Sequence, residues 1–285
     1  MWRSSAFPWT YVEAHFAGRR AEHLFQNVQA YVMFIGQPRS GTSLLGSILN
    51  AHRNMCVAQE LNALKYVSRG YDRRQLFWLL LKRDGSFAHT GRRWTGYDYV
   101  VPNQWQGHVE ELQVVGDKKA GLSTDQIGRD PKLLDRLAQI VQVPIRLVHV
   151  VRDPMNVIAT VHRRRKISLH RSTEIYFRRC ETNWQVMREY GDDVQTLRLE
   201  DLIATPHEYL INLCQFLGVT PSTDYITDCA GILFSRPRQS KAAVEWPKTL
   251  VERIQEEAQR YPFLSSYSID AATDPGSASS RSATA

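Results

Sequence analysis

The stretch YVMFIGQPRSGTSLLGSILNAH, residues 31–52, decides the fold. Its first six residues form a compact apolar run that ends at Gly36, which is typical of a buried strand. After the turn QPRSG, apolar residues at 44, 45, 48 and 49 recur at helical spacing. The stretch therefore predicts a strand, a tight turn and a helix in direct succession.

The same alternation continues along the chain. Further patterns of buried strands lie at 112–116, 145–151 and 194–199. Helical patterns lie between and after them, at 131–141, 155–166, 173–190 and 206–217. Strands that alternate with helices predict a central, mostly parallel sheet with helices on both faces, so the expected class is α/β, a P-loop-like three-layer sandwich.

Composition changes along the chain suggest its organisation. Residues 1–30 are expected to form an N-terminal extension with a short helix near 20–29, and residues 31–265 the main domain. The irregular region at 68–110, rich in aromatic residues, Arg and Gly, is predicted to be an insertion on the acceptor side. Residues 266–285 end in small polar side chains and are expected to be a disordered tail.

Charge and hydropathy narrow the classes of function. The net charge of +7 and the predominance of Lys and Arg suit an anionic ligand. No window reaches the roughly 18 consecutive apolar residues of a membrane span, and the first residues lack the apolar region of a signal peptide, so a cytoplasmic location is expected. The widely spaced Cys56, Cys180, Cys214 and Cys229 are predicted to be buried thiols.

The turn after the first strand has the chemistry of a phosphate-binding loop. Gly36 and Gly41 have the G-x-x-x-x-G spacing of a P-loop, where main-chain N–H groups and a helix N-terminus bind an anion. However, Thr42 occupies the position of the Walker lysine, and a cation stands three residues earlier, as Arg39. This departure favours a ligand with a single 5′-phosphate and no metal over the Mg²⁺-bound triphosphate of a kinase.

The segment PRSGTSLLGSILNAH resembles the 5′-phosphosulfate-binding loop of sulfotransferases that use 3′-phosphoadenosine 5′-phosphosulfate (PAPS). The bacterial and tyrosylprotein sulfotransferases are the most similar, because they also have Arg where the cytosolic group has Lys. The resemblance implies transfer of a sulfuryl group from PAPS to an acceptor hydroxyl or amine by in-line displacement, with adenosine 3′,5′-bisphosphate as the product. The loop residues implied to bind PAPS are Arg39, Ser40, Gly41, Thr42 and Ser43.

A second segment is expected to bind the 3′-phosphate. Arg152 follows the apolar strand that ends at Val151, at the carboxyl end where open α/β sheets bind ligands. Thr160 lies eight residues later, where the 3′-phosphate segment of sulfotransferases has Ser. A structural pair, Arg152 with Asp153 at a helix start, is the alternative. The late basic loop of the family has no clean match here, and Arg236 and Arg238 are its expected counterparts.

Glu60 is the expected catalytic base. It lies 21 residues after Arg39, where tyrosylprotein sulfotransferases carry their catalytic glutamate, and MCVAQ can return the chain toward the loop as a short strand. The alternatives are that Glu60 caps the helix beginning at ELNALKYV, or that His89 or His108 is the base.

Two cations are expected to stabilise charge on the leaving oxygen. They are Arg39 and Lys118, the latter in GDKKAG, which resembles a segment of bacterial sulfotransferases. Lys119 would replace Lys118 if the register differed by one residue.

Two other functions remain open on the sequence alone. One is an Mg²⁺-dependent P-loop nucleotide or small-molecule kinase, and the other is a nucleic-acid-binding protein that uses basic runs such as residues 162–166. The preferred interpretation requires no nucleic acid and no metal. Its acceptor is expected to be a small molecule, a carbohydrate or a lipid, with peptide tyrosine also open.

Overall fold

The computed structural model describes residues 6–94 and 96–270. It divides into two compact units. The first comprises the described residues up to Arg152 together with residues 178–237, and the second comprises residues 153–177 and 238–270. The long helix α8 (Leu169–Tyr190) begins in the second unit and ends in the first.

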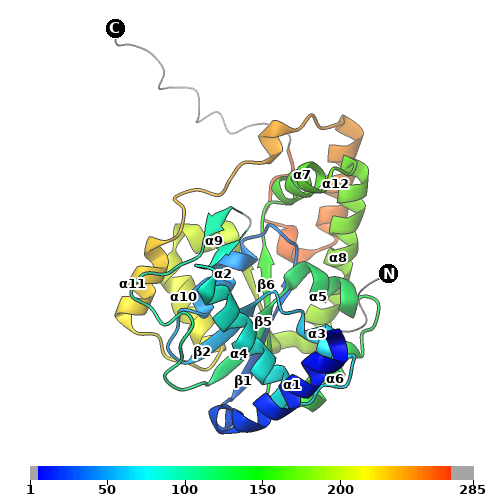
Figure 1. The fold of residues 1–285 in the computed structure, drawn as a ribbon. Coiled ribbons are helices and arrows are strands. Elements are labelled where there is room, and N and C mark those ends of the chain that lie inside the picture. The colour runs from blue at the N-terminus through cyan, green and yellow to red at the C-terminus, as the bar shows by residue number, and fades with distance from the viewer. Residues whose placement is uncertain (1–5, 95, 271–285) are drawn as a thin grey trace. The chain divides into compact units, whose positions relative to one another are not determined.

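A five-stranded parallel sheet forms the centre of the first unit (Figure 1). Its strands are β1 (Ala30–Gly36), β2 (Met55–Gln59), β5 (Val114–Lys118), β6 (Ile145–Val151) and β7 (Val194–Arg198). They lie in the order β2-β5-β1-β6-β7, and every neighbouring pair is parallel. The order places β1 at the centre, so its carboxyl end and the turn that follows lie in the middle of the sheet's edge.

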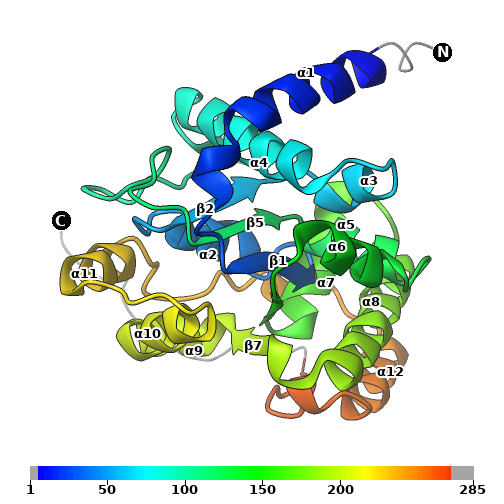
Figure 2. The ribbon, with the colours of Figure 1, turned by 90° about the horizontal axis from the view of Figure 1, so that it is seen from below.

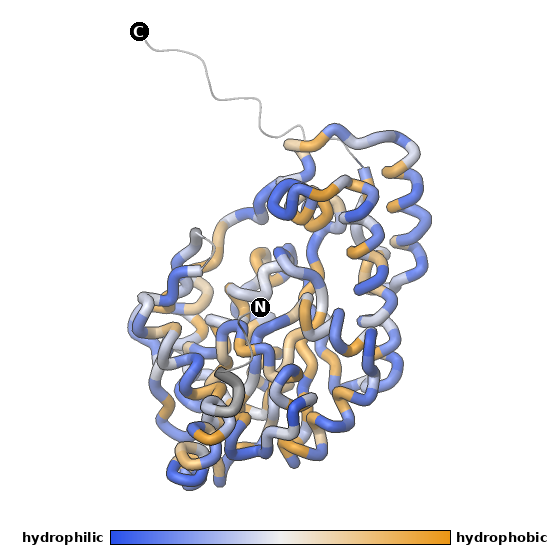
Figure 3. The backbone as a smooth tube through the Cα atoms, turned by 45° about the vertical axis from the view of Figure 1, so that its right-hand side comes forward, coloured by the Kyte–Doolittle hydropathy of each residue, from blue (hydrophilic) through white to orange (hydrophobic). Residues whose placement is uncertain are grey.

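Helices cover both faces of this sheet, which confirms the predicted α/β class (Figure 2). On one face, a buried cluster joins side chains of β1 to α2 (Thr42–Leu49), α10 (Pro206–Phe216) and α11 (Thr223–Gly231). On the other face, a second cluster joins β1 to α3 (Ala63–Val67), α4 (Arg73–His89) and α6 (Leu133–Val141). Alternate residues of β1 point to the two faces, as the period of a strand requires. Hydrophobic residues gather along these central elements, and hydrophilic residues lie mostly outside them (Figure 3).

The remaining elements of the first unit complete its outer layer. Their bounds are α1 (Ala6–Arg20), α5 (Ala120–Ile127), α9 (Leu199–Ala204), a two-stranded ribbon of β3 (Arg93–Trp94) and β4 (Tyr97–Asp98), and the 3-10 turns at Glu22–Phe25 and Gly191–Asp193.

The expected short helix near 20–29 is wrong. The helix is α1, which ends at Arg20, and only a single 3-10 turn follows it. The reason is tertiary: α1 packs against α4, with Ala14 fully buried. At Gly18 an added Cβ would lie 2.8 Å from the carbonyl oxygen of Arg74, so the close packing of the two helices requires a residue without a side chain.

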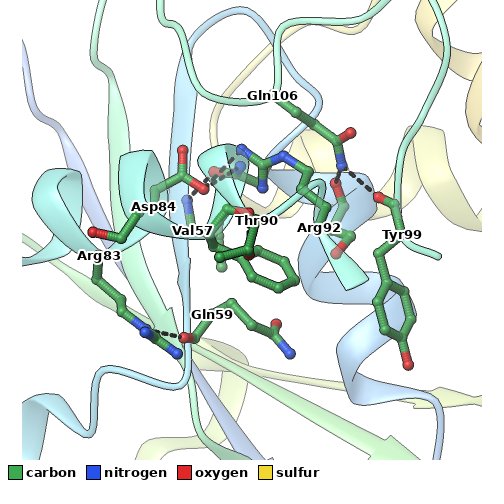
Figure 4. A network of polar contacts seen from close by, with 12 residues as sticks. Val57, Gln59, Arg83, Asp84, Thr90, Arg92, Tyr99 and Gln106 are labelled. Carbon is green, nitrogen blue, oxygen red and sulfur yellow. Dashed lines mark hydrogen bonds and ion pairs between the residues drawn. The ribbon is translucent and has the colours of Figure 1, made fainter. Parts of the chain in front are cut away.

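The expected inserted region at 68–110 contains α4, the β3–β4 ribbon and a loop, and a buried polar network connects it to the sheet (Figure 4). Helix α4 begins at Arg73, and the preceding Asp72 caps it in a capping box with Gln75. From this helix, Asp84 accepts hydrogen bonds from Asn50 (2.8 Å) and Arg92 (3.0 Å). The loop joins α2 through Gln106, whose Nε2 donates to the carbonyl oxygen of Ser47 (3.0 Å).

The second unit is built around α7 (Pro154–Arg165), with α12 (Lys248–Gln259), the first part of α8 and the 3-10 turns at Lys241–Ala243 and Pro262–Leu264. Asp153 caps α7 by accepting from the Asn156 main-chain N–H (3.0 Å), with Pro154 in the first turn. Lys241 joins this helix start, because its Nζ lies 3.1 Å from Asp153 Oδ2 and its N–H donates to Asn156 Oδ1 (2.9 Å).

Other expectations can be compared directly. The four cysteines are free and buried, as predicted. Among the described residues, no helix has the length and apolar character needed to cross a bilayer. The boundaries of the main domain and its insertion stay predictions, and most of the expected tail, residues 271–285, lies outside the described residues.

Candidate active site

The phosphate-binding loop lies between β1 and α2, at the carboxyl end of the central strand. At its start, the Gly36 main-chain N–H donates to Thr124 Oγ1 (2.9 Å). Arg39 and Gly41 have left-handed backbone conformations, with φ of 75° and 89°. A Cβ at Gly41 would lie 2.6 Å from Leu199 Cδ1, so both the conformation and the packing favour glycine there.

The loop has the properties of an anion site. Helix α2 begins at Thr42, so its first main-chain N–H groups and the positive end of its dipole are at the loop. Ser40 is fully buried, and its Oγ has no hydrogen-bond partner among the described residues. A buried hydroxyl without a partner is costly in a folded protein. The residues present therefore fit a bound phosphate or sulfate group.

Glu60 and Lys118 meet beside this loop. Strand β2 ends at Gln59 and pairs in register with Lys118 at the end of β5. Glu60 Oε1 accepts a hydrogen bond from Lys118 Nζ (2.6 Å), and Glu60 Oε2 is bonded to Lys119 Nζ. Lys118 Nζ also donates to Ser43 Oγ (2.8 Å) in the first turn of α2. One carboxylate, two ammonium groups and the start of α2 are thus joined in a single cluster.

Burial and charge act in opposite directions on this cluster. Burial raises the pKa of Glu60, but Lys118 and then Lys119 outweigh it and hold the pKa below its ordinary value. Burial lowers the pKa of Lys118, and Glu60 offsets part of that effect. Only 2% of the Lys118 side chain is exposed, so its position is set by these partners. Glu60 is consequently ionised at neutral pH.

The alternative role of Glu60 as a helix cap is wrong. Helix α3 begins at Ala63 with Asn62 at its N-cap position, and the Glu60 side chain instead binds the two lysines. His89 is the last residue of α4, and His108 lies in the loop beyond the ribbon. Both histidines are exposed.

The residues expected at the 3′-phosphate lie in both units. Arg152 follows β6 in the first unit, is 8% exposed, and donates from Nη1 to the carbonyl oxygen of Arg39 (2.9 Å). Arg236 is exposed in the same unit. In the second unit, Thr160 Oγ1 donates to the Asn156 carbonyl oxygen (2.7 Å) within α7, and Arg238 is exposed. The structure thus brings Arg152 to the loop and describes the others each within its own unit.

Sequence reasoning missed some residues around the cluster. Lys118 and Lys119 both contact Glu60, whereas the sequence analysis gave them as alternatives for a single cation. Asp117, which binds the turn after Glu60, was not singled out. The available signal was a run of charged residues at the end of an otherwise apolar strand.

Comparisons with known proteins agree with the fold. The model of the family described as "Sulfotransferase family" matches residues 32–224. The sulfotransferase domain of the olefin synthase of Synechococcus PCC 7002 has 18% sequence identity and a TM-score of 0.52, over 82% of this chain and 94% of that one. The sulfotransferase domain from the curacin biosynthetic pathway has 15% identity and a TM-score of 0.52, over 82% and 96%. The comparison with curated protein sequences gave no match.

At these identities the solved structures establish a shared fold, and the family model covers well over half of the chain. No comparison favours the kinase alternative. The chain therefore belongs to the sulfotransferase family and is an enzyme of sulfuryl transfer.

Proposed function

We propose that the chain transfers a sulfuryl group from PAPS to an acceptor hydroxyl or amine at the carboxyl ends of β1, β2 and β5. The observation that carries this proposal is the hydrogen-bonded series from Glu60 to Lys118 to Ser43 at the start of α2. It unites a proton acceptor, a cation and an anion-binding loop, which are the parts that such a displacement requires.

The donor would be held at two places. Residues 39–43 would bind the 5′-phosphosulfate through main-chain N–H groups, the hydroxyls of Ser40, Thr42 and Ser43, and the Arg39 guanidinium. The residues proposed for the 3′-phosphate are Arg152, Thr160, Arg236 and Arg238. The contact between Arg152 and the Arg39 carbonyl supports this for Arg152, because it places a buried cation against the loop. When bound, PAPS supplies the activated sulfuryl group and a phosphate leaving group.

The chain's own residues would then divide the chemistry. Glu60, ionised and close to the loop, accepts the proton of the acceptor hydroxyl or amine. Lys118 and Arg39 place positive charge where the bridging oxygen of the leaving group gains negative charge. Lys119, which binds the other oxygen of Glu60, orients that carboxylate. We propose that this set of cations makes a metal ion unnecessary.

The acceptor is proposed to be a small molecule, a carbohydrate or a lipid, and a cytoplasmic location stays a prediction. The exposed histidines His89 and His108 are the alternative bases. If one of these histidines is the base, the Glu60→Gln variant should keep its activity.

The first experiment is calorimetric titration with adenosine 3′,5′-bisphosphate, ADP and ATP, in EDTA and then in Mg²⁺. We expect metal-independent binding that strongly prefers the 3′-phosphorylated nucleotide. Mg²⁺-dependent binding of ATP without that preference would contradict the proposed donor.

The second experiment tests the base. Glu60→Gln should lower kcat by roughly 10²–10⁴-fold, which is the usual contribution of a general base. Its affinity for adenosine 3′,5′-bisphosphate should change little, because the amide can still accept a hydrogen bond from Lys118. A fully active Glu60→Gln enzyme would move the assignment of the base to His89 or His108.

A further inference from the structure

Asp117 is a buried carboxylate that the proposed mechanism does not use. It precedes Lys118 in β5 and pairs in register with Met33 of β1 and Ala58 of β2. Because neighbouring residues of a strand point to opposite faces, Asp117 and Lys118 lie on opposite faces of the sheet. Asp117 is 2% exposed, so its side chain is surrounded by protein.

Both oxygens of Asp117 bind the turn that carries Glu60. Asp117 Oδ1 accepts from the Leu61 main-chain N–H (2.9 Å), and Oδ2 accepts from that of Ala63 (2.8 Å). These two N–H groups belong to the residues between β2 and α3. A side chain of one strand thereby fixes the turn at the end of its neighbour.

This turn needs to be held. Glu60 and Asn62 both have left-handed backbone conformations, with φ of 62° and 67°. Such conformations are unfavourable for residues other than glycine, and they persist only where surrounding contacts maintain them. The side chain of Asn62, at the N-cap of α3, makes no capping hydrogen bond, and Asp117 accepts from the N–H of Ala63, the first residue of that helix.

Two further contacts hold the start of the turn. The Glu60 N–H donates to the Lys118 carbonyl oxygen (3.2 Å), which continues the pairing of β2 with β5 by one residue. Arg83 Nε of α4 donates to the Gln59 carbonyl oxygen (2.7 Å) (Figure 4). These contacts fix residues 59 and 60 at the start of the turn, and the two hydrogen bonds to Asp117 fix the backbone of residues 61–63.

We propose that Asp117 is a positioning residue for sulfuryl transfer: through the N–H groups of Leu61 and Ala63, its carboxylate holds the turn that presents Glu60 to Lys118 and Lys119. This inference rests on the proposed role of Glu60 as the base. Asp117 itself touches only the protein, on the face of the sheet opposite Lys118. Its effect on the reaction therefore passes through the backbone of residues 60–63 and through its charge, which interacts electrostatically with Glu60 and Lys118.

The test is Asp117→Asn, with Asp84→Asn as the matched control. Asn keeps one acceptor oxygen, but its amide group faces a main-chain N–H, so one of the two bonds to the turn is lost. We expect kcat to fall by about 10–100-fold, as for a displacement of a reacting group by about 1 Å. The affinity for adenosine 3′,5′-bisphosphate should stay within about twofold. Asp84 is also a buried, hydrogen-bonded carboxylate, but it binds Asn50 and Arg92, so its variant should lose stability with little change in kcat.

A double-mutant cycle with Glu60→Gln separates the two proposals. If Asp117 acts through Glu60, then Asp117→Asn lowers kcat further by less than about twofold in the Glu60→Gln background. An equal loss in both backgrounds, or a normal kcat for Asp117→Asn alone, would overturn the positioning role. A fully active Glu60→Gln enzyme would instead overturn the assignment of the base, and the positioning role with it.

Hydrogen exchange in the wild-type protein keeps the inference testable if Asp117→Asn does not fold. The amides of Leu61 and Ala63 should exchange as slowly as those of the neighbouring strands, although they lie in a turn. Exchange of these two amides at the rate of exposed loops would show that Asp117 does not hold the turn.

Discussion

Gly46, in α2, packs against the side chain of Lys118. The variant Gly46→Ala tests whether Lys118 needs the space that a residue without a side chain leaves there. A Cβ at Gly46 would lie 2.7 Å from Lys118 Cγ and 3.0 Å from Lys118 Cβ. Both are atoms near the base of the lysine side chain, and its Nζ is held by Glu60 and Ser43. The lysine cannot turn aside without breaking those bonds, so the added methyl group should displace it.

Two opposing terms set the effect on stability. Replacing Gly by Ala inside a helix stabilises by about 1 kcal/mol. Adding a methyl group to a closely packed interior costs about 1–3 kcal/mol. The net loss is about 0–2 kcal/mol, which corresponds to a fall in Tm of roughly 2–4 °C for each kcal/mol in a chain of this size. The effect on kcat should be pronounced, a fall of about 10–100-fold, because a cation displaced by about 1 Å no longer faces the charge that develops on the leaving oxygen.

The assay combines thermal unfolding with steady-state sulfuryl transfer, and Gly85→Ala is the control. Gly85 also lies inside a helix, α4, but an added Cβ there meets no atom within 4 Å. This control should gain about 1 kcal/mol of stability and keep normal kcat. If Gly46→Ala matched Gly85→Ala in both Tm and kcat, the reasoning that Gly46 makes room for Lys118 would be refuted.

Three further predictions concern the loop and the buried carboxylate. Arg39→Ala should lower kcat by about 10²–10³-fold and change the free energy of unfolding by less than about 1 kcal/mol; normal turnover would remove Arg39 from the mechanism. Thr124→Val leaves the Gly36 N–H without its acceptor and should lower the free energy of unfolding by about 1–3 kcal/mol. Chemical denaturation measures this loss, and an unchanged midpoint would contradict the contact. Burial raises the pKa of the Asp117 carboxyl to about 6, above its unfolded value of about 3.9. The folded protein therefore holds this proton more tightly than the unfolded chain does. The stability that results is fully present below pH 4 and is lost as the pH rises through 6. The wild type should therefore lose stability relative to Asp117→Asn over that interval, by roughly 1.4 kcal/mol for each pKa unit of difference, and a constant difference between the two proteins would contradict this sign.

Local patterns in the sequence predicted most of the central sheet. The run at 145–151 matches β6, and the expected short strand MCVAQ matches β2. The strand expected at 112–116 instead spans Val114–Lys118, because pairing with β2 extends it through Asp117 and Lys118. Charged residues at the end of a strand look like a loop in the sequence. Here they are buried, because each has partners that other segments supply.

The sequence by itself determined the phosphate-binding turn, the α/β class and the family resemblance. These depend on apolar periodicity and on turn residues that act over a few positions, where hydrogen bonding and backbone conformation are local. It also indicated Glu60 and Lys118 separately. Only the tertiary structure decided that Glu60 binds both Lys118 and Lys119, that Asp117 binds the turn after Glu60, and that Arg152 contacts the loop. Those contacts join residues 54 to 113 positions apart along the chain, and the pairing of parallel strands, rather than any local pattern, brings them to one edge of the sheet.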